Sequence, residues 1–112
     1  MGDLAVINFD VFEDFLGDGD SSQMIDLFVE QAEEYLEELR ASYMHGSAQE
    51  WHDVAHKFKG MASFAGTELL WQACANAQKN YEVDHESKGM LLYEIENEVN
   101  KAIAFFKEVG VR

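Results

Sequence analysis

The residues best suited to chemistry lie close together in the middle of the chain. His56 has the side chain of a nucleophile, because a neutral imidazole keeps a free lone pair on one ring nitrogen. Lys59 follows three residues later, and on a helix this spacing places an ammonium group beside any anion attached to the ring. Phosphoryl transfer asks a protein mainly for positioning and for stabilisation of negative charge, and Lys59 offers part of the second.

His56 is expected to face solvent. A helix advances by about 100° per residue, so the apolar side chains between positions 51 and 65 fall within an arc of roughly 100° that must face a core. His56 lies roughly 150° from the centre of that arc, and its side of the helix also carries His52, Lys59, Gly60 and Ser63. The apolar residues of the arc are Trp51, Val54, Ala55, Phe58, Ala62 and Ala65.

Gly60 favours a functional role for this face. Glycine inside a helix costs about 1 kcal/mol relative to alanine, so its presence one turn beyond an exposed histidine needs a reason. Room for the close approach of another protein would supply that reason. The alternative is a solvated surface histidine with no role.

Helices are the only secondary structure that the sequence predicts to hold this face in place. There is no proline, and no long alternation of apolar and polar residues indicates a strand. We expect one domain over residues 1–112, an all-α antiparallel four-helix bundle with a short N-terminal helix packed over one end. The expected helices cover about 10–16, 21–44, 47–65, 67–81 and, after a polar break at 83–87, a last stretch with the apolar stripe Leu91, Ile95, Val99, Ala102, Phe106 and Val109.

Local signals mark the ends of the helices in the centre of the chain. Ser47 and Glu50 form the capping-box pattern, in which two side chains satisfy unpaired backbone donors. Gly66 is placed to end one helix in a left-handed conformation, and Thr67 can cap the helix that follows. So short a connection forces the two helices into an antiparallel hairpin.

Composition limits the partners and the compartment. The 112 residues include 22 Asp and Glu against 8 Lys and Arg, and the resulting net charge of −14 repels nucleic acid and anionic lipid. No apolar stretch approaches the roughly 20 residues needed to cross a membrane, and no secretory signal is recognisable. The single cysteine, Cys74, suits a reducing compartment, so we expect a cytoplasmic protein. We also expect a monomer. The start at methionine and the tidy last helix favour a free-standing protein over a part of a larger kinase, and both alternatives stay open.

The run Ala55-His-Lys-Phe-Lys-Gly-Met-Ala-Ser-Phe-Ala-Gly66 resembles the signature of histidine phosphotransfer (HPt) domains. The order of the expected helices is similar to that family across nearly the whole chain. The resemblance implies that His56 is phosphorylated, that Lys59 stabilises the phosphoryl group and that Gly60 admits the partner. Gln78 stands where some members have a glutamine that bonds and orients the imidazole. Two residues depart from the types usual at their places, Met61 and Ala65.

The resemblance further implies a phosphorelay intermediate, which is a carrier and not an enzyme. No nucleotide-binding loop is visible, so the phosphoryl group must come from another protein. The expected partners are the receiver domains of a hybrid sensor histidine kinase and of a response regulator. The receiver would bring the aspartate and the magnesium ion, and the chain itself needs no cofactor or metal. The expected docking residues are Gly60, Ser63, Phe12, Phe15 and Met24.

Two other interpretations stay open. His52 and His56 are four residues apart, a spacing that lets two imidazoles on one helix face share a zinc ion, although no cysteine cluster accompanies them. Alternatively, the chain is an inert helical adaptor that binds signalling partners without phosphotransfer. Zinc titration would test the first interpretation, and incubation with a phosphorylated receiver domain would test the second.

Overall fold

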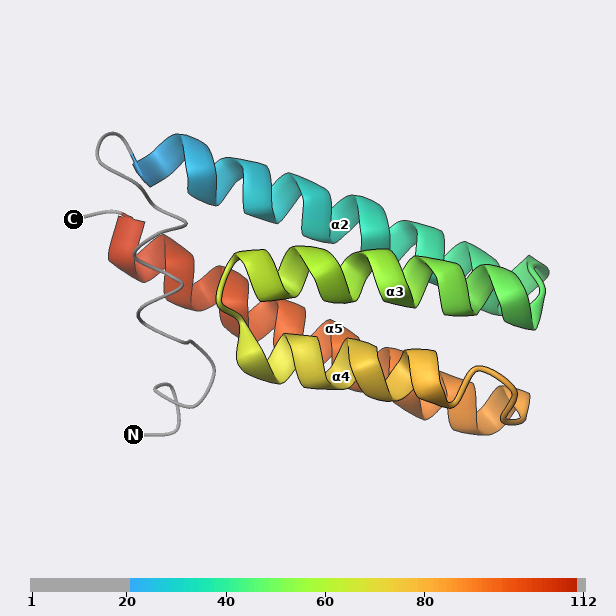
Figure 1. Cartoon of the computed structure of the whole chain (residues 1–112). Helices are drawn as coiled ribbons and strands as arrows, with labels where there is room; N and C mark the ends of the chain where they lie inside the picture. Colours follow the sequence, from blue (N-terminus) through green and yellow to red (C-terminus); the bar gives the residue numbers. More distant parts are fainter. Residues whose placement is uncertain (1–20, 111–112) are drawn as a thin grey trace.

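Four helices make up most of the chain that the structure describes. The computed structural model describes residues 21–110, which form α2 (Ser21–His45), α3 (Ala48–Phe64), α4 (Glu68–Lys79) and α5 (His85–Gly110) and contain no strand (Figure 1). The helix expected over 10–16, together with Phe12 and Phe15, lies outside the described residues.

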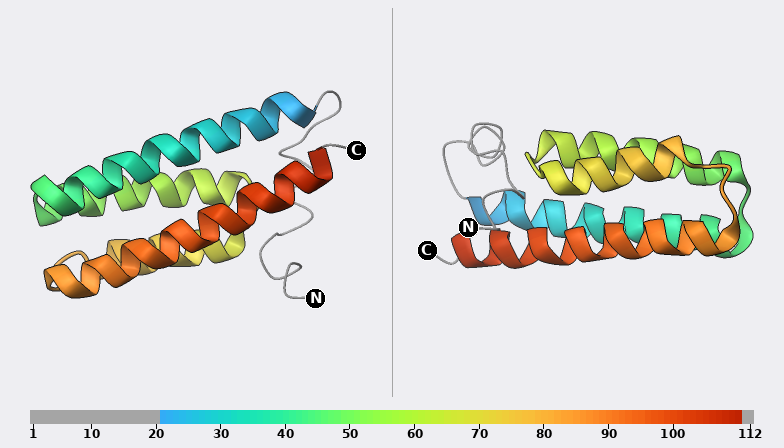
Figure 2. Two further views of the ribbon diagram at one scale, coloured as in Figure 1. Left: turned by 180° about the vertical axis from the view of Figure 1, so that it is seen from behind. Right: turned by 90° about the horizontal axis from the view of Figure 1, so that it is seen from below.

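The four helices form an antiparallel bundle. α3 and α4 lie side by side in one layer, and α2 and α5 lie in a second layer (Figure 2). Each helix packs against two neighbours, since α2 and α4 both contact α3 and α5. α2 and α5 are the longer pair, with 25 and 26 residues, and they extend past the α3–α4 hairpin at the end where α2 begins. The predicted four-helix bundle is therefore confirmed for this part of the chain.

The core contains the apolar stripes that the sequence predicts, with one shift on α5. Phe28 of α2 and Phe106 of α5 meet edge to face in its interior, with ring centroids 4.7 Å apart. On α5 the buried leucine is Leu92, whereas the predicted Leu91 is only half-buried. Leu92 continues the alternating three- and four-residue spacing of the α5 stripe, which comprises Ile95, Val99, Ala102 and Phe106.

Specific hydrogen bonds form at the start of α3 and at the turn between α3 and α4. Ser47 caps α3 as predicted, because its Oγ accepts the N–H of Glu50 at 3.1 Å. Gly66 has the predicted left-handed conformation, with φ of 78°. The prediction for Thr67 was wrong: its hydroxyl donates to the carbonyl of Ala62 at 2.9 Å and makes no cap on α4. Thr67 is fully buried, so its hydroxyl satisfies a carbonyl at the end of α3 instead.

α5 starts earlier than the sequence pattern predicts. The helix begins at His85, inside the stretch 83–87 that was expected to be a polar break. Asp84 explains the difference, because its carboxylate accepts the backbone N–H of Ser87 at 2.8 Å and so caps the first turn.

Trp51 fixes the register of α3 against α4. Its indole Nε1 donates to the carbonyl of Ala77 at 2.9 Å, and both residues are fully buried. Ala77 lies in the last turn of α4, where carbonyls lack partners within the helix. The bond therefore satisfies two buried groups and determines which residues of the two helices face each other.

Candidate functional site

His56 lies on the exposed side of α3, as the helical arithmetic predicts. The opposite side of the helix consists of residues with no exposed surface, which are Trp51, Ala55, Phe58 and Ala62. Among residues 21–110, no side chain forms a hydrogen bond or an ion pair with the His56 ring. As far as the described chain is concerned, the ring is therefore accessible to a reactant that arrives from solvent.

Lys59 lies on the same face and is held by a residue of α4. Its Nζ atom is 5.9 Å from the centroid of the Trp71 ring, within the range of a cation–π contact. Lys59 is half-buried by this contact, whereas Lys57 is exposed. The structure thus places one ammonium group close to the surface of the α3–α4 hairpin, one turn beyond His56.

Gly60 leaves open space on this face. A Cβ atom added at Gly60 would meet no heavy atom within 4 Å. Gly46 is different, since a Cβ added there would lie 2.9 Å from the Cα of Ser42. Nothing in the packing of residues 21–110 therefore requires glycine at position 60. The glycine is instead consistent with a need for space that a second protein would occupy.

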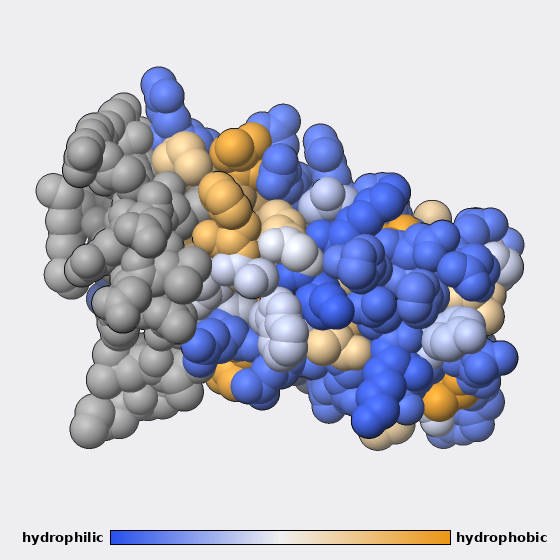
Figure 3. All heavy atoms as spheres, viewed as in Figure 1, coloured by the Kyte–Doolittle hydropathy of each residue, from blue (hydrophilic) through white to orange (hydrophobic). Residues whose placement is uncertain are grey.

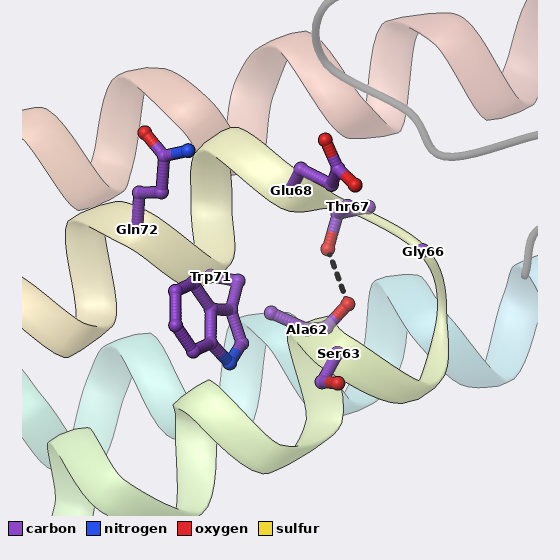
Figure 4. A pocket seen from close by; sticks show the side chains of 7 residues that line it. All are labelled: Ala62, Ser63, Gly66, Thr67, Glu68, Trp71 and Gln72. Atoms are coloured by element: carbon purple, nitrogen blue, oxygen red, sulfur yellow. Dashed lines mark hydrogen bonds between the residues drawn. The ribbon is translucent and has the colours of Figure 1, made fainter.

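A pocket of about 290 Å³ opens between the end of α3 and the start of α4. Ser63 and Trp71 lie on its two sides, and Gly66 and Thr67 form its end (Figure 4). Because Trp71 also contacts Lys59, the pocket and the exposed face of His56 belong to one continuous surface. Ser63, a predicted docking residue, is exposed at this pocket, and Met24 on α2 is half-buried.

The charge around His56 differs from that of the rest of the molecule. Residues 54–67 contain Lys57 and Lys59 but no Asp or Glu, although the chain as a whole has a net charge of −14. This stretch of the chain carries positive charge without a carboxylate, which favours an anion such as a phosphoryl group.

Gln78 does not bond His56 in the structure. Its Nε2 atom instead lies 3.4 Å from Nε2 of His52. His56 lies between two contacts that join α3 to α4. One is that of Lys59 with Trp71, and the other is that of His52 with Gln78. The orientation of the His56 ring by Gln78 is thus not seen here.

His52 is enclosed by polar and aromatic neighbours. Its Nδ1 atom lies 3.2 Å from Oδ1 of Asp53, and its ring meets the ring of Tyr81 edge to face at 5.0 Å. Hydrogen bonds, first from His52 and then from Gln49, lower the pKa of the Asp53 carboxyl below its ordinary value. His52 is therefore not a free surface histidine, although the sequence placed it on the same face as His56.

A metal site is not supported by the residues that the structure describes. Among them, no three His, Cys, Asp or Glu side chains gather in a way that could hold an ion. Both ring nitrogens of His52 already have protein partners, which leaves neither for a zinc ion shared with His56. Cys74 is buried, and burial raises the pKa of its thiol far above the ordinary value, so its thiolate is not available as a ligand.

The sequence did not predict two contacts of this surface. One is the contact of Trp71 with Lys59. Their positions on either side of the Gly66 turn were the available signal, because an antiparallel hairpin brings residues at similar distances from its turn together. The contact of His52 with Gln78 follows from the same register and was missed for the same reason.

A four-helix bundle that presents an exposed histidine, with a lysine and a glycine three and four residues later, has the features of a histidine phosphotransfer domain. The sequence model of the Hpt domain family matches residues 23–104, which is most of the chain, and the chain therefore belongs to this family. Hpt domains carry phosphoryl groups on histidine in the phosphorelays of two-component signalling, and they interact with receiver domains of response regulators. No curated protein and no solved structure matches the chain. None of the helices described here is long and apolar enough to cross a membrane.

Proposed function

We propose that His56 is the residue that carries the phosphoryl group and that it exchanges this group with an aspartate of receiver domains. The observation that supports this most is the position of His56 on the solvent side of α3, with Lys59 on the same face and open space at Gly60. These three residues stand in the stretch matched by the Hpt family.

The reaction needs one nucleophilic nitrogen. The unprotonated nitrogen of neutral His56 attacks the phosphorus of an aspartyl phosphate, and a nitrogen–phosphorus bond forms. The phosphorus–oxygen bond to the aspartate breaks, and its electron pair leaves on the carboxylate. The second ring nitrogen keeps its proton throughout. The same steps in reverse return the phosphoryl group to an aspartate.

Lys59 stabilises the negative charge of the transferred group in this proposal. Its ammonium lies one turn from His56 and can interact with the phosphoryl oxygens once it leaves the Trp71 ring. The magnesium ion that the family resemblance implies belongs to the receiver domain, and no step assigned to this chain's residues uses it.

The receiver domain docks over α2 and α3 in this proposal. Apolar atoms gather on the face shown in Figure 3, at the end of the bundle where α2 begins and α3 ends. Leu27 of α2 is 44% exposed and Phe64 of α3 is 68% exposed. They give an apolar area at this end of the bundle, about two turns of α3 beyond His56, of the kind that protein interfaces use, and the exposed Ser63 adds a polar group next to it.

Several finer points stay predictions. Phe12 and Phe15 are expected to join the docking surface through a short N-terminal helix packed over the same end. We propose that residues 1–112 form one domain, a monomer that works in the cytoplasm. Its partners would be the receiver domains of a hybrid sensor histidine kinase and of a response regulator. It is expected to lack kinase elements of its own and to depend on these partners for phosphate.

The test is transfer of labelled phosphate from a phosphorylated receiver domain to the full chain. The wild-type chain is expected to gain a label that is lost in acid and kept in base, as a phosphorus–nitrogen bond requires. His56→Gln should gain none, while His45→Gln, on an exposed histidine at the end of α2, should behave as wild type. Equal labelling of His56→Gln would show that another residue carries the phosphoryl group. An unlabelled wild type that still binds the receiver would favour an inert adaptor.

A further inference from the structure

We infer that His52 is a positioning residue for His56: it holds the amide nitrogen of Gln78 and leaves the amide oxygen to accept the ring proton of His56. This inference rests on the proposed role of His56 as the phosphoryl carrier. It starts from the three side chains that contact the His52 ring, which belong to Asp53, Gln78 and Tyr81.

Asp53 sets the tautomer of His52. Its carboxylate oxygen lies 3.2 Å from Nδ1 of His52, and an ionised carboxylate can only accept, so the proton of the neutral ring is on Nδ1. Nε2 of His52 is then an acceptor. The edge-to-face contact with Tyr81, at an interplanar angle of 67°, further restricts the orientation of the ring.

The orientation of the Gln78 amide follows from this tautomer. Only the amide nitrogen can donate to an unprotonated ring nitrogen, and it lies 3.4 Å from Nε2 of His52. The amide oxygen is left for another partner. This oxygen is buried, and within residues 21–110 it has no hydrogen-bond partner. Buried polar atoms nearly always have a partner, so a donor is missing from this arrangement.

His56 is the donor that completes it. The histidine lies one turn, about 6 Å, beyond His52 along α3, and its neutral ring carries one N–H. Lys59, the next donor on this face, is engaged with Trp71. When Gln78 accepts the ring proton of His56, the other nitrogen keeps its lone pair toward the partner, which is the tautomer that the transfer needs.

The first test is the tautomer of His56, read from long-range proton–nitrogen NMR spectra of the full chain labelled with ¹⁵N. His52→Phe keeps an aromatic ring against Tyr81 but has no acceptor for Gln78. In this variant the His56 signals should shift toward the tautomer ratio of free imidazole. His45→Phe, which makes the same replacement on an exposed histidine that is not the hydrogen-bond partner of Gln78, should leave them unchanged.

The second test is a double-mutant cycle on the rate of phosphoryl transfer from a saturating phosphorylated receiver. We expect His52→Phe and Gln78→Met each to slow transfer about tenfold, and the double variant to be slowed by the same factor instead of a hundredfold. His52→Gln, whose amide oxygen can accept from Gln78, should recover most of the rate. Binding of the receiver should not change in any of these variants.

Two results would overturn the inference. One is a His56 tautomer ratio that is the same in wild type, His52→Phe and Gln78→Met. The other is a cycle in which the two rate losses multiply, which would mean that His52 does not act through Gln78. A wild-type chain that never accepts phosphate would instead contradict the proposed function, and the NMR comparison would still decide whether His52 positions His56.

Discussion

The Nζ atom of Lys59 lies over the indole of Trp71, 5.9 Å from the ring centroid, and this contact links α3 to α4 beside the exposed histidine. Trp71 is 40% exposed, and a cation–π contact at such a site is worth about 0.5–1 kcal/mol. A phosphoryl group, with a charge near −2, can compete for the ammonium at that cost. The contact therefore keeps Lys59 near His56, and the ammonium group can still leave the indole to bind a phosphoryl group.

Replacing Lys59 should slow transfer more than replacing its neighbour on the helix. We expect Lys59→Gln to reduce the single-turnover rate about tenfold, because the loss of one charge-stabilising group costs roughly 1–2 kcal/mol in the transition state. Lys57→Gln removes the same charge from an exposed residue and is the matched control, with an expected change below about twofold. An equal loss in both variants would show that only net charge matters.

Gly60→Ala should separate stability from function. The added methyl group meets no heavy atom within 4 Å, so the free energy of unfolding should stay the same or rise by up to about 1 kcal/mol. Phosphoryl transfer should nevertheless slow, and slow further in Gly60→Leu, because the side chain occupies the space that admits the receiver. Urea unfolding and transfer kinetics on the same samples give both quantities.

Gly46→Ala is the converse variant. Its methyl group would lie 2.9 Å from the Cα of Ser42, so the bundle should lose stability while the folded fraction transfers phosphate at the wild-type rate. If Gly60→Ala transferred phosphate as fast as wild type, the open space at Gly60 would have no part in docking.

Trp51→Phe should destabilise the bundle because it removes a single buried hydrogen bond. Phenylalanine keeps most of the buried ring, but the carbonyl of Ala77 loses the donor that lies 2.9 Å from it. A buried acceptor without a partner costs about 1–3 kcal/mol, to be measured as a lower urea midpoint. Trp71→Phe, at a partly exposed site, is the control and should change the free energy of unfolding by less than about 0.5 kcal/mol.

The sequence predicted the helices well because the signals for a helix are local. Ser47 lies three residues before the backbone N–H that it caps, and Gly66 takes its left-handed conformation at the turn itself. The errors arose where one residue had two possible local partners. The hydroxyl of Thr67 bonds backward to Ala62 instead of capping α4, and Asp84 begins α5 within a stretch that looked like a loop.

The site was predictable only in part, for a geometric reason. The exposure of His56 follows from spacing within one helix. The partners of Gln78 and Lys59 depend on how α3 and α4 slide past each other, and that register is set by the turn and by the bond of Trp51. The number of residues between His56 and Gln78 could not show which of two histidines one turn apart, His52 or His56, contacts Gln78.

The cap formed by Asp84 should make part of the stability depend on pH. Hydrogen bonds from Ser87, first from its side chain and then from its backbone, lower the pKa of the Asp84 carboxyl below the ordinary value of 3.8. A carboxyl with a lower pKa in the folded state stabilises the protein fully above 3.8, and this contribution is lost as the pH falls through the folded-state pKa.

Asp84→Asn isolates this contribution, because asparagine caps a helix about as well but does not titrate. The urea midpoint of the wild type should exceed that of the variant near pH 6, and the two should converge as the pH falls below 3.8. A difference that stays constant over this range would mean that the charge of Asp84 does not contribute.

The most direct test of the account is to locate the phosphoryl group by mass spectrometry under neutral conditions, after one turnover with a phosphorylated receiver domain. We expect a single phosphorylated residue, His56, in the peptide that also contains Lys59 and Gly60. A phosphoryl group found on His52 or on any other residue, with His56 unmodified, would contradict it.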